Sequence, residues 1–145
     1  AAHGHTILRS DILISAQYLR THALSSRKLG VTGFCWGGST TNWLATALGE
    51  ELQAAVPFYG AAAETAAVPR IKAALLAHYA QNDERINAMW PAYEAALKQT
   101  GVQYEMFMYA GTQHGFHNNS TPRYDAAAAK LAWDRTVAHF KRHLA

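Results

Sequence analysis

The sequence has very little cysteine: Cys35 is the single thiol among 145 residues. One cysteine cannot form an internal disulfide, so it is a buried apolar filler, an intermolecular link or a reactive thiol. A lone thiol is compatible with a reducing cytoplasm, and we favour the cytoplasm as the location of this protein. It is also compatible with an exported protein that has no disulfides.

Long hydrophobic runs and dense charge are also lacking. No apolar run approaches the roughly 20 residues of a membrane span, and residues 1–6 lack the basic and apolar regions of a signal peptide. Export stays open, because residue 1 need not be the first residue of the gene product. The formal net charge is only +3, and no basic run alternates with aromatic residues. We therefore expect neither a membrane nor a nucleic acid as a partner.

Half of the residues are hydrophobic, which is enough for one compact core, so we expect a single domain over residues 1–145. Apolar periodicity and turn residues predict helices and strands that alternate along the chain. The expected helices cover residues 6–22, 39–48, 88–100 and 123–144, and the expected strands cover 29–34, 52–59, 73–79 and 102–109. This order predicts an α/β fold, with a mostly parallel sheet and helices on both faces.

Three reactive side chains follow three of the expected strands. Cys35 comes after the first strand, Asp83 after the third and His114 after the fourth. In parallel sheets of this kind, functional sites lie outside the carboxyl ends of the strands. The three residues are of nucleophile, acid and base type, so we expect them to form one site. Glu84 is a rival for the acid, although the shorter side chain of Asp83 suits the turn better.

Cys35 also lies within a frame of glycines, G-x-C-x-G-G, over residues 33–38. This spacing is typical of a nucleophile elbow, with cysteine in place of serine. The strained turn needs neighbours without side chains, and the N-terminus of the following helix favours a thiolate. In this reading the Trp36 amide faces the developing oxyanion. His114 takes the thiol proton, and Asp83 holds the histidine tautomer.

Four segments carry a family resemblance: "GVTGFCWGG", "AVPFYG", "LLAHYAQNDERIN" and "YAGTQHGFHN". They resemble the dienelactone hydrolase family of the α/β-hydrolase superfamily, over roughly residues 6–144. The resemblance implies Cys35 as nucleophile, Asp83 as acid and His114 as base, with Trp36 giving one oxyanion-hole amide. It also implies hydrolysis of a small-molecule lactone or activated carboxylic ester, without a metal or organic cofactor.

The chain departs from this family in length. The family fold has several strands before the elbow strand, and they supply the second oxyanion amide and a glutamate that influences the cysteine. Here only one expected helix precedes that strand, so the chain resembles the C-terminal half to two-thirds of the family domain. We therefore expect a homo-oligomer or a complementary N-terminal segment as a partner. The alternative function is a catalytically incomplete remnant that acts only in such an assembly.

A second departure concerns the substrate. The family's type member uses arginines, one of them shortly after the histidine, to hold a substrate carboxylate. Here the stretch "HGFHNNSTPR" has no arginine before Arg123, which speaks against a carboxylate-bearing substrate.

The remaining candidates are aromatic residues and histidines near the strand ends. Phe34, Tyr59, Phe116 and His117 are candidate substrate contacts, although aromatic residues at strand ends often belong to the core. His114 and His117 have the spacing H-x-x-H. No clustered carboxylate or second cysteine completes a tetrahedral set, so we expect no metal site.

Overall fold

The computed structural model describes residues 2–145, with side chains from residue 4 onward. Its elements follow in the order α1 (Ala2–Thr21), β1 (Gly30–Phe34), α2 (Trp36–Leu48), η1 (Gly49–Glu51), β2 (Ala54–Phe58), η2 (Thr65–Arg70), β3 (Ala74–Asn82), α3 (Glu84–Asn87), α4 (Trp90–Thr100), β4 (Tyr104–Gln113) and α5 (Ala126–Leu144). The two η elements are short 3₁₀ helices.

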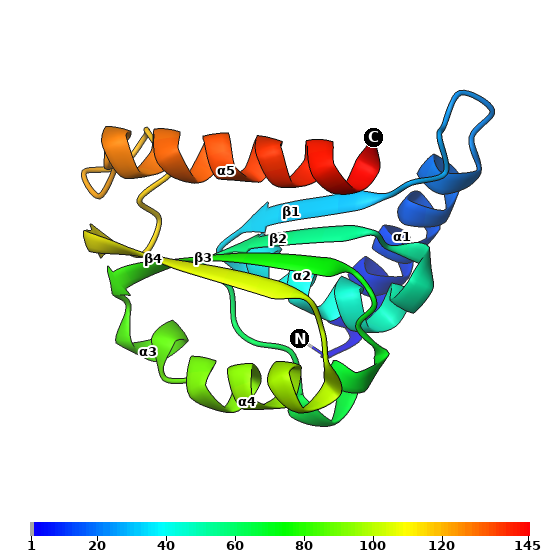
Figure 1. The fold of residues 1–145 in the computed structure, drawn as a ribbon, viewed down its shortest axis with the longest axis horizontal. Coiled ribbons are helices and arrows are strands. Elements are labelled where there is room, and N and C mark those ends of the chain that lie inside the picture. The colour runs from blue at the N-terminus through cyan, green and yellow to red at the C-terminus, as the bar shows by residue number, and fades with distance from the viewer. Residues whose placement is uncertain (1) are drawn as a thin grey trace.

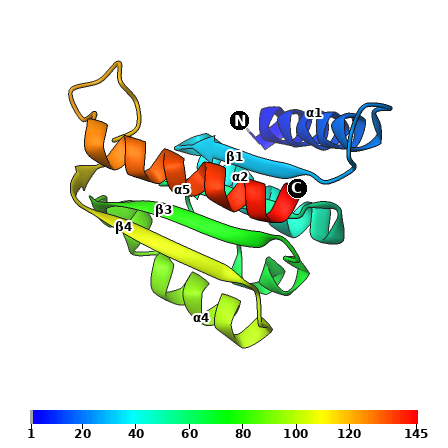
Figure 2. The ribbon, with the colours of Figure 1, turned by 45° about the horizontal axis from the view of Figure 1, so that its top comes forward.

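The four strands form one sheet in the order β1-β2-β3-β4, and each pair of neighbours is parallel. Helix α5 lies over one face of this sheet, and helices α2 and α4 lie on the other (Figures 1 and 2). Parallel strands need helical crossovers, and these crossovers cover both faces. The predicted α/β class, with helices on both faces of a parallel sheet, is confirmed.

The core has two layers because side chains of a strand alternate between the faces of the sheet. Leu75 on β3 packs with Tyr93 and Leu97 toward α4, whereas its neighbour Leu76 packs with Ala132 toward α5. Every residue of the central strand β2 is buried. This burial explains why its sequence, AAVPF, reads as a continuous apolar run instead of alternating with polar residues.

All four predicted helices begin at other residues than the sequence pattern predicts. Helix α1 begins at Ala2 and not at 6, and helix α4 begins at Trp90 and not at 88. Helix α2 begins at Trp36 and not at 39, because Cys35 itself is the residue before the first helical turn. Helix α5 begins at Ala126 and not at 123. The Asp125 carboxylate accepts a hydrogen bond from the Ala128 amide at 2.9 Å and so caps the helix there.

Strands β3 and β4 run further than predicted, to Asn82 and Gln113, into segments that read as polar loops. The Gln81 side-chain oxygen accepts a hydrogen bond from the Gly111 amide at 2.7 Å and links the two extensions. The short elements η1, η2 and α3 were not predicted. Across residues 2–145, none of the helices combines the length and apolar character that a membrane span requires.

Helix α1 is attached to the body through few side chains. The Arg9 guanidinium lies over the Trp43 ring at 4.7 Å, Arg20 pairs with Glu51 at 3.3 Å, and Ala16 is buried. Away from these contacts α1 exposes large apolar side chains, namely Ile7, Leu8, Ile14, Tyr18 and Leu19, each 47–65% exposed. We call these five residues the outer stripe of α1.

Candidate active site

Cys35 is the single residue between β1 and α2, and its backbone is strained. Its φ and ψ are 54° and −116°, a backbone conformation that residues other than glycine rarely adopt. The Cys35 amide donates to the Phe58 carbonyl at 3.1 Å, and the Cys35 carbonyl accepts from the Ser39 amide at 3.1 Å. Backbone strain that surrounding bonds maintain in this way is characteristic of functional sites. The Cys35 side chain is half-buried.

The glycines around Cys35 are required for space at some positions and not at others. A Cβ on Gly33 would overlap the Gly37 backbone, and a Cβ on Gly38 would overlap the Phe58 carbonyl. A Cβ on Gly60, which follows β2, would overlap the Gly38 and Ser39 backbones. A Cβ on Gly37 would meet nothing within 4 Å. Close backbone packing between the turn and the end of β2 therefore explains Gly33, Gly38 and Gly60.

This difference predicts opposite outcomes for two adjacent substitutions. Gly38→Ala is expected to lower the free energy of unfolding by about 1–3 kcal/mol, through overpacking against the Phe58 carbonyl. Gly37→Ala is expected to be neutral or to raise it by up to about 1 kcal/mol, because alanine favours a helix. Urea unfolding of both variants measures the difference. Equal effects at the two positions would contradict the packing argument.

Asp83 and His114 form the closest polar contact of the site. The Asp83 Oδ2 and His114 Nδ1 atoms are 2.5 Å apart, and the Asp83 side chain is buried. Asp83 precedes α3 but makes no capping hydrogen bond with it, so its carboxylate is free to face His114. Glu84, the rival acid, is exposed. The structure thus pairs Asp83 with the histidine. The Nδ1–H donates to the carboxylate, which leaves a lone pair on Nε2.

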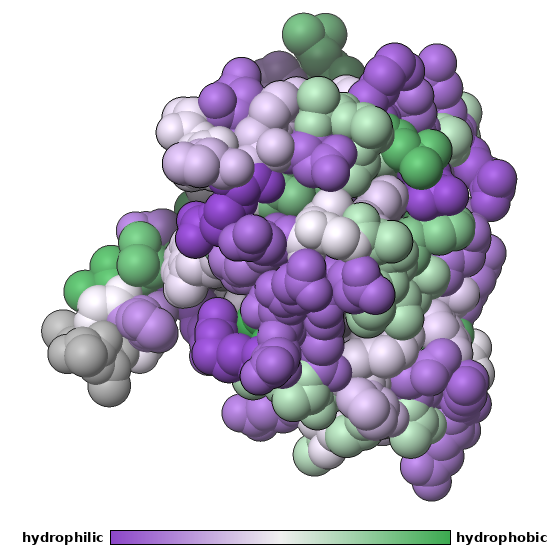
Figure 3. Space-filling model, turned by 90° about the vertical axis from the view of Figure 1, so that its left-hand side faces the viewer, coloured by the Kyte–Doolittle hydropathy of each residue, from purple (hydrophilic) through white to green (hydrophobic). Residues whose placement is uncertain are grey.

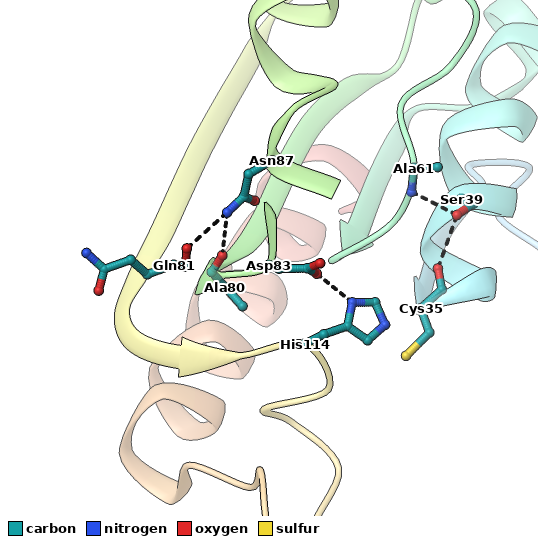
Figure 4. Close-up of polar contacts among 8 residues, drawn as sticks. All are labelled: Cys35, Ser39, Ala61, Ala80, Gln81, Asp83, Asn87 and His114. Carbon is teal, nitrogen blue, oxygen red and sulfur yellow. Dashed lines mark hydrogen bonds and ion pairs between the residues drawn. The ribbon is translucent and has the colours of Figure 1, made fainter. Parts of the chain in front are cut away.

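The third residue, Cys35, lies on the other side of this histidine. In Figure 4 the His114 ring lies between the Asp83 carboxylate and Cys35. Burial raises the pKa of the Cys35 thiol, the charge of Arg123 lowers it, and the charge of Asp83 raises it. The net direction is upward, so the resting thiol is protonated near neutral pH. Formation of a thiolate at Cys35 therefore requires a base that takes its proton.

Trp36 is the first residue of the 13-residue helix α2. The first amides of a helix have no acceptor within the helix, and they carry the positive end of its dipole. The Trp36 amide follows Cys35 directly, so it is available to an oxyanion beside the sulfur. Its indole ring is 53% exposed and does not take part in the core.

The four candidate substrate contacts divide into two pairs. Phe34 is 36% exposed and lies 5.0 Å from the His117 ring. Both line an open hollow of about 500 Å³ together with Trp133 and Tyr124. Tyr59 and Phe116 are at most 1% exposed. In this structure both residues belong to the buried core, and the Tyr59 ring packs 5.0 Å from the His114 ring.

Arg123 is a site residue that the sequence pattern did not indicate. Its guanidinium lies beside Gly115, and its charge acts on both Cys35 and Tyr59. The residue is nine positions after His114, and only the folded loop between them brings it back. No local spacing pattern would have identified it.

Within the described part of the chain, no group of three or more histidine, cysteine, aspartate or glutamate side chains could hold a metal ion. The face at the carboxyl ends of the strands, seen in Figure 3, is largely hydrophilic.

Comparison with known proteins gives consistent matches. The model of the dienelactone hydrolase family matches residues 4–144. The protein usf of Aquifex pyrophilus is 36% identical over 124 residues, which are 83% of this chain and 53% of that protein. A Yersinia pestis protein named as a carboxymethylenebutenolidase is 30% identical, over 92% of this chain and 54% of its own length. A crystal structure described as a dienelactone hydrolase of Klebsiella pneumoniae has a TM-score of 0.82 and 26% identity, over 93% of this chain and 60% of its own. The chain thus spans between half and two-thirds of the length of these proteins.

Proposed function

Because this chain belongs to the dienelactone hydrolase family, we propose that it hydrolyses a lactone or an activated carboxylic ester through a cysteine nucleophile. Cys35 is the nucleophile, His114 the general base and Asp83 the acid of a Cys-His-Asp triad. The observation that carries the proposal is the 2.5 Å contact between Asp83 and His114, beside the strained turn that presents Cys35.

The first half of the reaction forms a thioester. His114 Nε2 takes the proton from the Cys35 sulfur, and Asp83 stabilises the resulting imidazolium. The thiolate adds to the substrate carbonyl carbon, and the Trp36 amide donates to the oxyanion that forms. The carbon–oxygen bond to the leaving group then breaks, and His114 returns the proton to the departing oxygen. In a lactone this oxygen remains attached through the opened ring.

The second half releases the acid. His114 accepts a proton from water as the water oxygen adds to the thioester carbonyl. The carbon–sulfur bond breaks, and the proton returns to the sulfur. The products are a carboxylic acid and an alcohol, or a hydroxy acid from a lactone. No cofactor is needed, because both protons pass through His114.

Trapping the thioester tests this proposal. The protein is mixed with p-nitrophenyl acetate, quenched in acid, digested and mapped by mass spectrometry. We expect an acetyl group on the peptide that contains Cys35, together with release of nitrophenol. Protein alkylated beforehand with iodoacetamide is the control and should gain no acetyl group. Turnover without any adduct, at the same rate in the alkylated control, would refute a cysteine nucleophile.

The outer stripe of α1 supports a second proposal, which concerns the partner. The stripe exposes five large apolar side chains, each 47–65% exposed. A surface of this kind marks an interaction site. We propose that a second copy or a complementary segment covers it, and that without this partner the chain is a catalytically incomplete remnant. Light scattering and the ester assay on the same sample test this. A monodisperse, fully active monomer would refute it.

A further inference from the structure

The loop between β4 and α5 is folded back on itself by backbone hydrogen bonds. The Asn118 amide donates to the Gly115 carbonyl at 2.9 Å, and the Asp125 amide donates to the Phe116 carbonyl at 3.0 Å. Phe116 is fully buried and anchors the start of the loop. These bonds bring the end of the loop, with Arg123, back over its beginning beside His114.

Gly115 provides the surface against which Arg123 lies. Its φ is +86°, a backbone conformation that residues other than glycine rarely adopt. The atoms closest to the position of a Cβ on Gly115 are Nη2 and Nε of Arg123, at 3.6 and 3.7 Å. The guanidinium therefore packs on the residue that directly follows His114.

The charge of Arg123 reaches two groups of the site. It lowers the pKa of the Cys35 thiol and that of the Tyr59 hydroxyl, which are both raised chiefly by burial. Asp83 acts in the opposite direction on Cys35. His114 faces the same site and becomes a cation only once it has accepted a proton. Arg123 is thus a cation that is already in place before the proton moves.

We propose that Arg123 is a positioning residue whose guanidinium, held against Gly115, stabilises the thiolate of Cys35. The inference rests on the proposed function and deepens it. Transfer of the proton from Cys35 to His114 creates a thiolate and an imidazolium. Asp83 then balances the imidazolium, and Arg123 balances the thiolate. An anion beside the imidazolium and a cation whose charge acts on the thiolate both favour the ion pair over the neutral pair.

The pH profile of alkylation tests this inference. The rate of iodoacetamide reaction at Cys35 is measured against pH for the wild type, Arg123→Gln and Arg123→Lys. Removing the cation should shift the rate–pH profile of Arg123→Gln toward higher pH by about 0.5–1 pH unit. The reaction near pH 7 should then be about three- to tenfold slower than in the wild type. Arg123→Lys should stay close to the wild type. Arg142→Gln, near the far end of α5, changes the net charge equally and should leave the profile unchanged.

The salt dependence of the alkylation rate is a second readout. It would not differ between the wild type and Arg123→Gln if Arg123 had only a structural role. About 0.5 M NaCl should slow alkylation of the wild type and have less effect on Arg123→Gln. A reactive wild type with an unchanged Arg123→Gln profile would overturn the inference. So would a loss confined to the hydrolysis of anionic esters, because Arg123 would then bind substrate charge. A wild type whose Cys35 does not alkylate would instead refute the proposed function itself.

Discussion

Replacement of Cys35 or His114 by alanine is expected to lower kcat/KM for an activated ester by about a thousandfold or more in each case. Cys35→Ala removes the nucleophile, and His114→Ala removes the base that the protonated thiol requires. Because the two groups act as a unit, the double variant should be no slower than the worse single variant. Initial rates with p-nitrophenyl acetate measure all three.

The control for this series is His22→Ala, an exposed histidine just after α1, which should keep the wild-type rate. Unchanged near-ultraviolet circular dichroism and unfolding midpoints would show that the variants remain folded. If His114→Ala retained most of the activity, the base would be another group, and the Asp83–His114 contact would have only a structural role. Additive losses in the double variant would contradict a shared step.

Acidification is expected to destabilise the fold through His78, which is fully buried on β3. Its hydrogen bonds suit only the neutral ring. The Thr136 hydroxyl donates to the Ala132 carbonyl, so its oxygen accepts from His78 Nε2 at 3.0 Å. The Tyr109 hydroxyl accepts from Arg135 and donates to His78 Nδ1 at 3.0 Å. A proton on Nδ1 would therefore face a donor.

Burial, with the nearby charge of Arg135, lowers the pKa of His78 to about 3 in the folded protein. In the unfolded chain the pKa is near 6.5. The unfolded state thus binds the proton first, and the free energy of unfolding falls as the pH drops through this window. The loss from His78 alone should amount to about 3 kcal/mol between pH 7 and pH 4. Urea unfolding at several pH values measures it.

The matched variants are His78→Gln and His5→Gln, the second at an exposed position of α1. His78→Gln is expected to be less stable at pH 7, because it loses packing in the core, but to show a flatter decline toward pH 4. His5→Gln should keep the wild-type slope. An unchanged slope in His78→Gln would show that other groups, such as the buried His139, cause the acid sensitivity.

The sequence alone predicted the features that depend on residues close to one another along the chain. The apolar run of β2 and the alternation of strands with helices determined the class of fold, because burial on both faces of a parallel sheet requires them. The glycine frame around Cys35 predicted the strained turn, since its backbone leaves no room for side chains at Gly33 and Gly38. The order of residues after the strands placed Asp83 and His114 at one edge of the sheet.

The tertiary structure decided what depends on distances between separate segments. Asp83 and His114 are 31 positions apart, and only the pairing of β3 with β4 brings them together and leaves Glu84 exposed. The same applies to Arg123, which only the closed loop brings back to Gly115. Local spacing encodes backbone conformation and burial. The contacts that bring charged side chains near the Cys35 thiol, and so change its pKa, arise from strand register and loop closure. No single stretch of sequence specifies these.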